Sequence, residues 1–215
     1  MVITVNEDYS KAFDEFSKNI SAQKMILRSF KQISPYKGNR LGLLISIAVA
    51  MIFAFAIGTS ENVVNLLHES ASTILNTKLA IFAVILTVYS IIYVFFDDTK
   101  LKIFAKTISP KSETFLNETA VFYQSIMFLY FISIAISGMI VLLMGILDND
   151  FRLTESLCFD RWLAKVLLFI YFSFSFRVFY ELKSAIYNTV QLFRLGVLVR
   201  LKRYTQEERE NMCDK

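Results

Sequence analysis

Residues that build catalytic and metal sites are scarce in this chain. Its 215 residues include six glycines, two prolines, two cysteines and one histidine. The glycines are scattered, which excludes a phosphate-binding loop. His68 has only Glu69 as an obvious neighbour, whereas a catalytic triad or a histidine metal site needs a nucleophile or further ligands beside it. Cys158 and Cys213 lack the spacing of metal ligands. We therefore expect no enzyme, no cofactor and no metal site.

Formal charge is missing from three long segments, residues 41–60, 79–96 and 119–147. About 20 apolar residues cross the ~30 Å hydrocarbon core as a helix, so each segment can span a membrane. A fourth segment, residues 162–180, can also span a membrane if Lys165 and Arg177 lie near its ends and extend toward the headgroups. With 55% hydrophobic residues and a mean hydropathy of +0.48, the chain is too apolar for a soluble domain. We predict an all-α polytopic membrane protein with four transmembrane helices, at about 41–60, 79–96, 120–147 and 162–180, and cytoplasmic helical extensions.

Lysine and arginine are unevenly distributed between the connections. They are frequent before the first span, between spans two and three, and after the fourth, but the first connection has only Lys78 and the third only Arg152 and Arg161. Positive residues are retained on the cytoplasmic side. We therefore expect both termini in the cytoplasm, and no cleaved signal peptide, because the first apolar segment begins only at Leu41. The predicted parts are a cytoplasmic amphipathic segment (1–40), a four-span bundle (41–181) and a cytoplasmic helical tail (182–215).

Small residues recur along the spans. In membranes, helix association depends on close backbone approach and polar contacts, which small side chains permit. Two interpretations remain open: these seams join helices within one subunit, or the first span packs against another copy. We expect a homo-oligomer and take a tetramer as the working number. The seam residues are Gly42, Ser46, Ala50, Ala54 and Gly58 in span one, Ala80, Ala83, Thr87 and Ser90 in span two, and Ser133, Ser137 and Gly138 in span three.

Helices are predicted to continue on the cytoplasmic side. Ser109 and Pro110 form a good start for the third helix, and one helix is expected from Trp162 to about Tyr204. The N-terminal stretch is amphipathic, with Asn6 as its cap and Pro35 at its end. It could lie on the membrane surface, bind a partner or, as we expect, pack on the bundle.

The tail holds the candidate docking residues for a soluble partner. Its apolar face persists beyond the length that a bilayer covers, so it needs another cover. Nearby basic residues are explained by topology and anionic lipid, and direct nucleic-acid binding is disfavoured. Arg177 and Glu181, four residues apart at the inner end of span four, form either a structural ion pair or part of a gate. The docking candidates are Ile186, Phe193, Val197, Arg200 and Arg203.

Two function classes remain. One is a membrane sensor or scaffold whose oligomer presents cytoplasmic helices to a soluble effector. The other is a small oligomeric ion channel or pore. The spans offer few polar residues to line a pore, and intramembrane acidic pairs, which mark ion-coupled transport, are absent. The helical extensions favour the scaffold.

The architecture resembles a known family. The size, the four spans, the inward termini and the charged tail, from the span Leu41–Ser60 to the tail Glu181–Lys215, look like the KwaA-like membrane component of the bacterial Kiwa anti-phage system. The resemblance covers the whole chain but includes no diagnostic motif, and SLATT-type defence proteins and phage exclusion proteins share much of the outline. It implies an inner-membrane sensor of phage infection that works with a soluble cytoplasmic KwaB-like effector acting on phage DNA functions.

Overall fold

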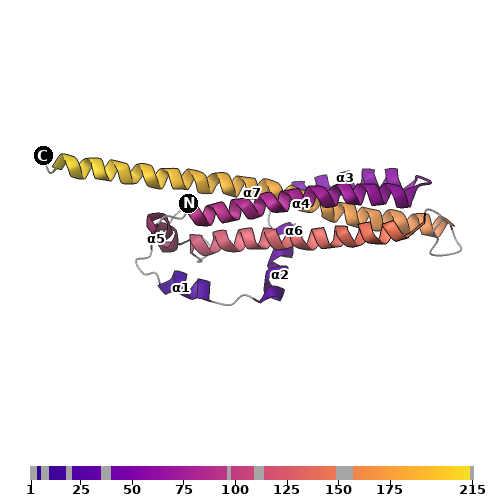
Figure 1. Cartoon of the computed structure of the whole chain (residues 1–215), viewed down its shortest axis with the longest axis horizontal. Coiled ribbons are helices and arrows are strands. Elements are labelled where there is room, and N and C mark those ends of the chain that lie inside the picture. Colours follow the sequence, from indigo (N-terminus) through magenta and orange to yellow (C-terminus); the bar gives the residue numbers. More distant parts are fainter. Residues whose placement is uncertain are drawn as a thin grey trace. The chain divides into compact units, whose positions relative to one another are not determined.

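The computed structural model describes residues 4–5, 10–17, 21–34, 40–95, 98–108, 114–148 and 157–213. Four of its helices, α3, α4, α6 and α7, are long and apolar enough to cross a membrane, so the prediction of an all-α polytopic fold is confirmed (Figure 1). The only strands in the described ranges are two-residue segments that pair antiparallel. In chain order the elements are β1 (Thr4–Val5), α1 (Ser10–Ser17), α2 (Ala22–Ile33), α3 (Arg40–Gly58), α4 (Val63–Phe95), α5 (Asp98–Lys106), β2 (Thr107–Ile108), α6 (Phe115–Ile146) and α7 (Leu157–Cys213).

The chain divides into two compact units. Unit 1 comprises residues 1–20, 87–123 and 183–215, and unit 2 comprises residues 21–86 and 124–182. Unit 2 therefore holds α2, α3 and the greater part of α4 and α6, together with the N-terminal part of α7. Its largest apolar core joins three helices, through Ala50, Ala54 and Ile57 of α3, Ala71 of α4, and Leu168, Tyr171 and Phe172 of α7.

The small-residue ladder of α3 lies inside this core and faces α7. All five ladder residues are buried within one chain. A methyl group built on Gly42 would overlap the ring of Tyr180, and one built on Gly58 would lie 2.5 Å from the Lys165 side chain. The two helices are therefore antiparallel and in close backbone contact. At 1.5 Å per residue, the 19 residues of α3 measure about 28 Å, close to the thickness of the hydrocarbon core. Because its ends meet Lys165 and Tyr180, α3 lies beside the stretch of α7 between these two residues.

The second membrane helix begins much earlier than predicted. The charge-free segment suggested a start near residue 79, but α4 starts at Val63, and Val63, Leu67 and Ile74 all pack against the core. His68 and Lys78, which we placed in a connection, are therefore helical. The prediction failed because it treated a single lysine as the membrane boundary. The connection between α3 and α4 is reduced to residues 59–62, which contain no Lys or Arg.

The N-terminal stretch forms two helices instead of one. Ser21, in extended conformation, accepts a hydrogen bond from the backbone N–H of Lys24 and so starts α2 as a separate helix. α1 belongs to unit 1 and α2 to unit 2, and the extended Ser21 ends the possibility of one continuous amphipathic helix. The proposed cap Asn6 and the terminator Pro35 lie outside the described residues.

The third membrane helix is capped by Thr114. Its hydroxyl accepts a hydrogen bond from the Asn117 N–H, and its own N–H and hydroxyl donate to Glu15 of α1, at 3.0 and 2.6 Å. Ser109 and Pro110, the start we predicted, lie outside the described residues, and α6 begins at Phe115.

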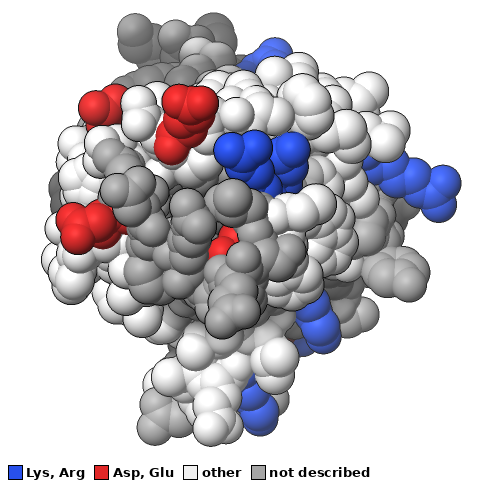
Figure 2. Space-filling model, turned by 90° about the vertical axis from the view of Figure 1, so that its right-hand side faces the viewer, with Lys and Arg blue, Asp and Glu red and all other residues white. Residues whose placement is uncertain are grey.

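The fourth membrane helix is continuous for 57 residues, which confirms the prediction of a single long helix. It passes through Gly196 without a break. Figure 2 views the end of the molecule where α3 turns into α4. Acidic and basic groups are both visible in this view, so the described surface seen there does not carry charge of one sign.

Candidate functional site

A buried lysine is the centre of the first polar cluster in unit 2. Lys78, on α4, is fully buried. Its ammonium donates to the hydroxyl of Ser137 at 2.8 Å, to the hydroxyl of Ser175 at 3.0 Å and to the carbonyl of Ser133 at 3.4 Å. An ammonium has three N–H donors, and here each has one oxygen acceptor. Tyr171 donates to the Ser137 hydroxyl at 3.2 Å and presents its ring 5.5 Å from the ammonium nitrogen.

This arrangement holds a charge at membrane depth, and no acidic side chain in the described part of the chain pairs with Lys78. Ser175 lies five residues before Tyr180, so the ammonium is roughly 7–8 Å along α7 from the level where α3 begins. On insertion scales a lysine is unfavourable by about 2.5–3.5 kcal/mol at the centre of a span and by less nearer its end, so this value is an upper bound for Lys78. Three oxygen acceptors and an aromatic ring offset that cost and tie α4 to both α6 and α7. The cluster is suited to fixing the packing of three helices, because the Ser137 hydroxyl of α6 and the Ser175 hydroxyl of α7 both accept hydrogen bonds from Lys78 of α4.

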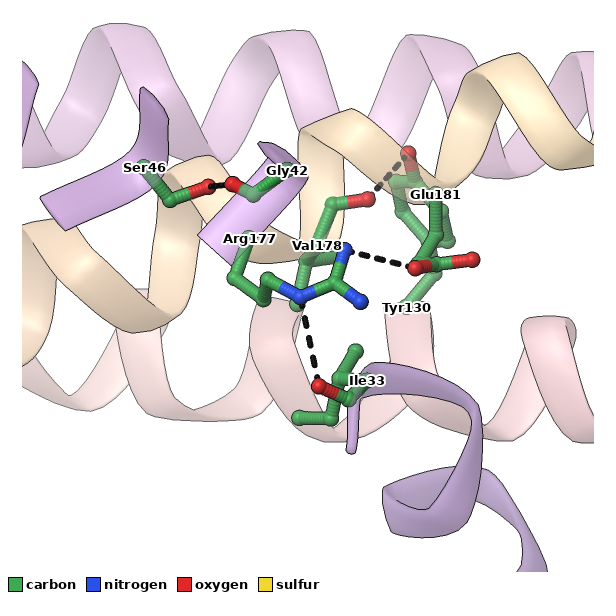
Figure 3. Close-up of polar contacts among 7 residues, drawn as sticks. All are labelled: Ile33, Gly42, Ser46, Tyr130, Arg177, Val178 and Glu181. Carbon is green, nitrogen blue, oxygen red and sulfur yellow. Dashed lines mark hydrogen bonds and ion pairs between the residues drawn. The ribbon is translucent and has the colours of Figure 1, made fainter. Parts of the chain in front are cut away.

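The second polar cluster is the predicted pair on α7, shown in Figure 3. Arg177 Nη1 lies 2.6 Å from Oε1 of Glu181, and both side chains are only 5% exposed. The Nη1–Oε1 contact is an ion pair, and neither Nη atom makes a hydrogen bond to a described residue. Nearby, the Tyr130 hydroxyl donates to the carbonyl of Val178 at 3.3 Å.

The guanidinium also binds the C-terminal end of α2. Its Nε donates to the carbonyl of Ile33 at 3.2 Å (Figure 3). This carbonyl is in the last turn of α2, where helix carbonyls lack intrahelical partners and attract positive charge. The rings of Phe30 and Phe174 add a contact at 6.5 Å between centroids. Arg177 therefore links α2 to α7, a role that its position in the sequence did not indicate.

The docking candidates on α7 are exposed. Ile186, Phe193 and Val197 have 52–57% of their surfaces accessible, and Arg200 is also exposed. The side chain of Arg203 lies outside what the structure describes. Within unit 1, the opposite side of α7 packs: Ala185 is buried, and the Tyr123 hydroxyl lies 2.7 Å from the Thr189 hydroxyl.

The small residues predicted as a seam in span two lie on the outside of α4. Ala80, Ala83, Thr87 and Ser90 are all exposed, whereas the buried residues of this helix are Ala71, Lys78, Ile85 and Ile92. In α6, Ser133 and Ser137 are buried beside Lys78. A methyl group added to Gly138 would have no atom within 4 Å, so this glycine makes no close helix contact with a described residue.

One signal in the sequence could have revealed the lysine site. The residues before it, from Val63 to Ile74, carry apolar side chains at helical spacing, and Ser133 and Ser137 lie one turn apart on another span. A lysine inside such a helix must find polar acceptors. Ser175, however, is separated from Lys78 by 97 positions, and no local pattern connects them.

The fold defines a polytopic α-helical membrane protein with two buried polar clusters between its helices. No family model, curated protein or solved structure matches the chain. Among the described residues, no group of three or more His, Cys, Asp or Glu side chains could hold a metal ion. The resemblance to the Kiwa membrane component stays a prediction.

Proposed function

We propose that this protein is a membrane scaffold that presents the C-terminal part of α7 to a soluble cytoplasmic protein. The observation that carries the proposal is the length of α7 compared with α3. We take the stretch of α7 that α3 covers, from Lys165 to Tyr180, as its membrane-spanning part, because the length of α3 matches the hydrocarbon core. Residues 182–213 continue the same helix for about 48 Å, which is more than the whole hydrocarbon core requires.

This extension carries an apolar stripe. Six exposed residues follow one another at steps of three and four, which places them on one helix face. Outside the bilayer no lipid covers them, and a contiguous apolar face of this kind marks a protein interaction site. The basic residues Lys183, Arg194 and Arg200 are also exposed on the same helix and favour a partner with an acidic surface. The stripe consists of Ile186, Val190, Phe193, Val197, Leu201 and Tyr204.

Self-association is part of the proposal and is supported by α4. Because the α3 ladder is filled by α7, the exposed small residues of α4 are the better candidates for a contact between copies. Ala80 and Ala83 allow close approach of a second helix. Replacing both with leucine should lower the mass of the detergent-solubilised particle, and an unchanged mass would remove α4 from the subunit contact.

Partner capture tests the scaffold. Phe193→Ser and Val197→Asn together should abolish co-purification of the soluble partner while membrane insertion is retained. Leu198→Asn is the matched control, because Leu198 is 60% exposed but lies about 100° around the helix from Val197. Under the Kiwa-like interpretation, the partner is a KwaB-like effector, and the stripe variant would also lose phage protection.

The alternative function is an oligomeric channel, and it has an opposing test. Purified protein in liposomes should give no single-channel currents if the scaffold proposal is correct. Reproducible currents that are unchanged by the Phe193 and Val197 substitutions would favour the pore.

A further inference from the structure

The helix α2 divides its surface into three sides. One side faces the other helices of unit 2, and on it Ser29 is completely buried and Ile33 is half-buried. The second side is apolar and exposed, with Ile26, Leu27 and Phe30 at 37%, 64% and 41% exposure. The third side is basic and exposed, with Lys24, Arg28 and Lys31. No acidic residue occurs anywhere in α2.

The depth of α2 follows from its contacts with α7. Ile33 is held by Arg177, three residues before Tyr180, and Phe30 contacts Phe174, six residues before it. Since Tyr180 lies against the first turn of α3, these contacts are roughly 4.5 and 9 Å inward from that level. Interfacial amphipathic helices bury their apolar face about 5–10 Å into the boundary between headgroups and acyl chains. The contacts of α2 fall in this layer.

The direction of α2 agrees with this depth. In Figure 1, α2 runs across the direction of the long helices of unit 2 and not along it. A helix lying across the spans is parallel to the membrane plane, so its apolar side can face acyl chains while its basic side faces the headgroups.

We propose that α2 is an interfacial helix that binds anionic phospholipid. Leu27, Ile26 and Phe30 enter the acyl-chain region, and Lys24, Arg28 and Lys31 bind phosphate groups of lipids such as phosphatidylglycerol. Lipid is favoured over a protein partner because the apolar side lies at membrane depth and all three formal charges of the helix are positive. Acidic residues would oppose the binding of anionic lipid. Those of the N-terminal stretch belong to α1 or lie outside the described residues, and α2 is a separate helix without any.

A fluorescent label at Leu27 tests the proposal. The full-length protein, with Cys158 and Cys213 replaced by serine, carries Leu27→Cys labelled with a nitrobenzoxadiazole dye. It is reconstituted in vesicles of phosphatidylcholine alone or of phosphatidylcholine and phosphatidylglycerol in equal amounts. Lipids with a spin label high on the acyl chain should quench the dye in both vesicles, and about two-fold more strongly when phosphatidylglycerol is present.

Charge variants identify the lipid contact. Replacing Lys24, Arg28 and Lys31 with glutamine should remove the additional quenching by phosphatidylglycerol vesicles, because each basic residue near an anionic surface strengthens binding about five-fold. The matched control replaces three exposed basic residues of α7 with glutamine and should retain the additional quenching. These residues are Lys183, Arg194 and Arg200. Arg28→Gln alone is the milder variant if the triple change reduces the yield of folded protein, and it should give a partial loss.

Two results would overturn the proposal. A dye that is quenched by aqueous iodide and not by labelled lipid would place Leu27 in water. If quenching is equal in both vesicle types, and the same in both triple variants, lipid charge does not contribute to the binding of α2. The quenching measurement needs no protein partner. Lipid binding by α2 can therefore be refuted while the scaffold function stands, and the scaffold function can be refuted while lipid binding stands.

Discussion

Replacing Ser175 with alanine tests whether the ammonium of Lys78 joins the helices of unit 2. The change removes one of three acceptors and leaves an N–H of a buried charge without a partner. A hydrogen bond to a charged group contributes about 1.5–3 kcal/mol in proteins, whereas the largest values from double-mutant cycles inside membranes are about 1.7 kcal/mol. The ranges overlap, and we expect Ser175→Ala to lower the free energy of unfolding by about 1.5 kcal/mol.

The expected loss depends on the lysine itself. Lys78→Met removes a charge whose burial is unfavourable by at most about 2.5–3.5 kcal/mol together with three hydrogen bonds that contribute about 4.5 kcal/mol in total, at about 1.5 kcal/mol each. We therefore expect a net loss of about 1–2 kcal/mol. In that background Ser175→Ala should be nearly neutral. The four proteins of this cycle would be unfolded by detergent titration in bicelles, and the coupling free energy read from the difference.

A neighbouring serine supplies the control. The Ser173 hydroxyl is buried on the same helix and makes no hydrogen bond to a described residue, so Ser173→Ala should not destabilise the protein. If Ser175→Ala is as costly in the Lys78→Met protein as in the wild type, the hydroxyl supports some other contact, and the argument for an ammonium-centred joint is refuted.

Three further predictions follow from other contacts. Glu181→Gln leaves the buried Arg177 charge uncompensated and should destabilise the protein by about 3–5 kcal/mol, measured by the same titration; a loss below about 1 kcal/mol would mean that solvent reaches the guanidinium. Gly42→Ala should cost about 1–3 kcal/mol through overpacking, whereas Gly138→Ala, with nothing within 4 Å of its new methyl group, should be neutral or stabilising, and equal effects would contradict the close α3–α7 contact. A reporter enzyme fused after Lys215 should indicate the cytoplasm, and a periplasmic signal would reverse the topology inferred from Lys and Arg.

The membrane helices could be predicted because the signal is local. Continuous apolar composition and the absence of charge identified four of them, and the unbroken pattern after Trp162 identified the long α7. The contacts that each membrane helix makes with the others could not be predicted to the same degree. Gly42 to Gly58 indicated a close contact, but only the fold shows that Tyr180 and Lys165 of the same chain fill it.

The largest errors came from polar residues. An exposed Lys78 would mark the end of a membrane span, whereas a buried Lys78 with oxygen acceptors connects neighbouring helices. The sequence does not distinguish the two, because the acceptors belong to spans that come later in the chain. Ser21 was similarly ambiguous, since a serine within an amphipathic stretch can continue a helix or cap a new one. The ion pair of Arg177 and Glu181 could be read from their spacing, but the contact of Arg177 with Ile33 depends on how α2 folds back onto the bundle.

The three-acceptor site around Lys78 also has a consequence for how the protein is made. Ser137 and Ser175 follow Lys78 by 59 and 97 residues. At about 5–20 residues per second, the ribosome delivers them roughly 3–12 and 5–20 seconds later. During that interval the Lys78 ammonium lacks the two serine hydroxyls that accept its hydrogen bonds in the folded protein. The hydrogen bonds that tie α4 to its neighbours can therefore form only after α6 and α7 have been made, and a chain that ends before Ser175 lacks one of the three acceptors of Lys78.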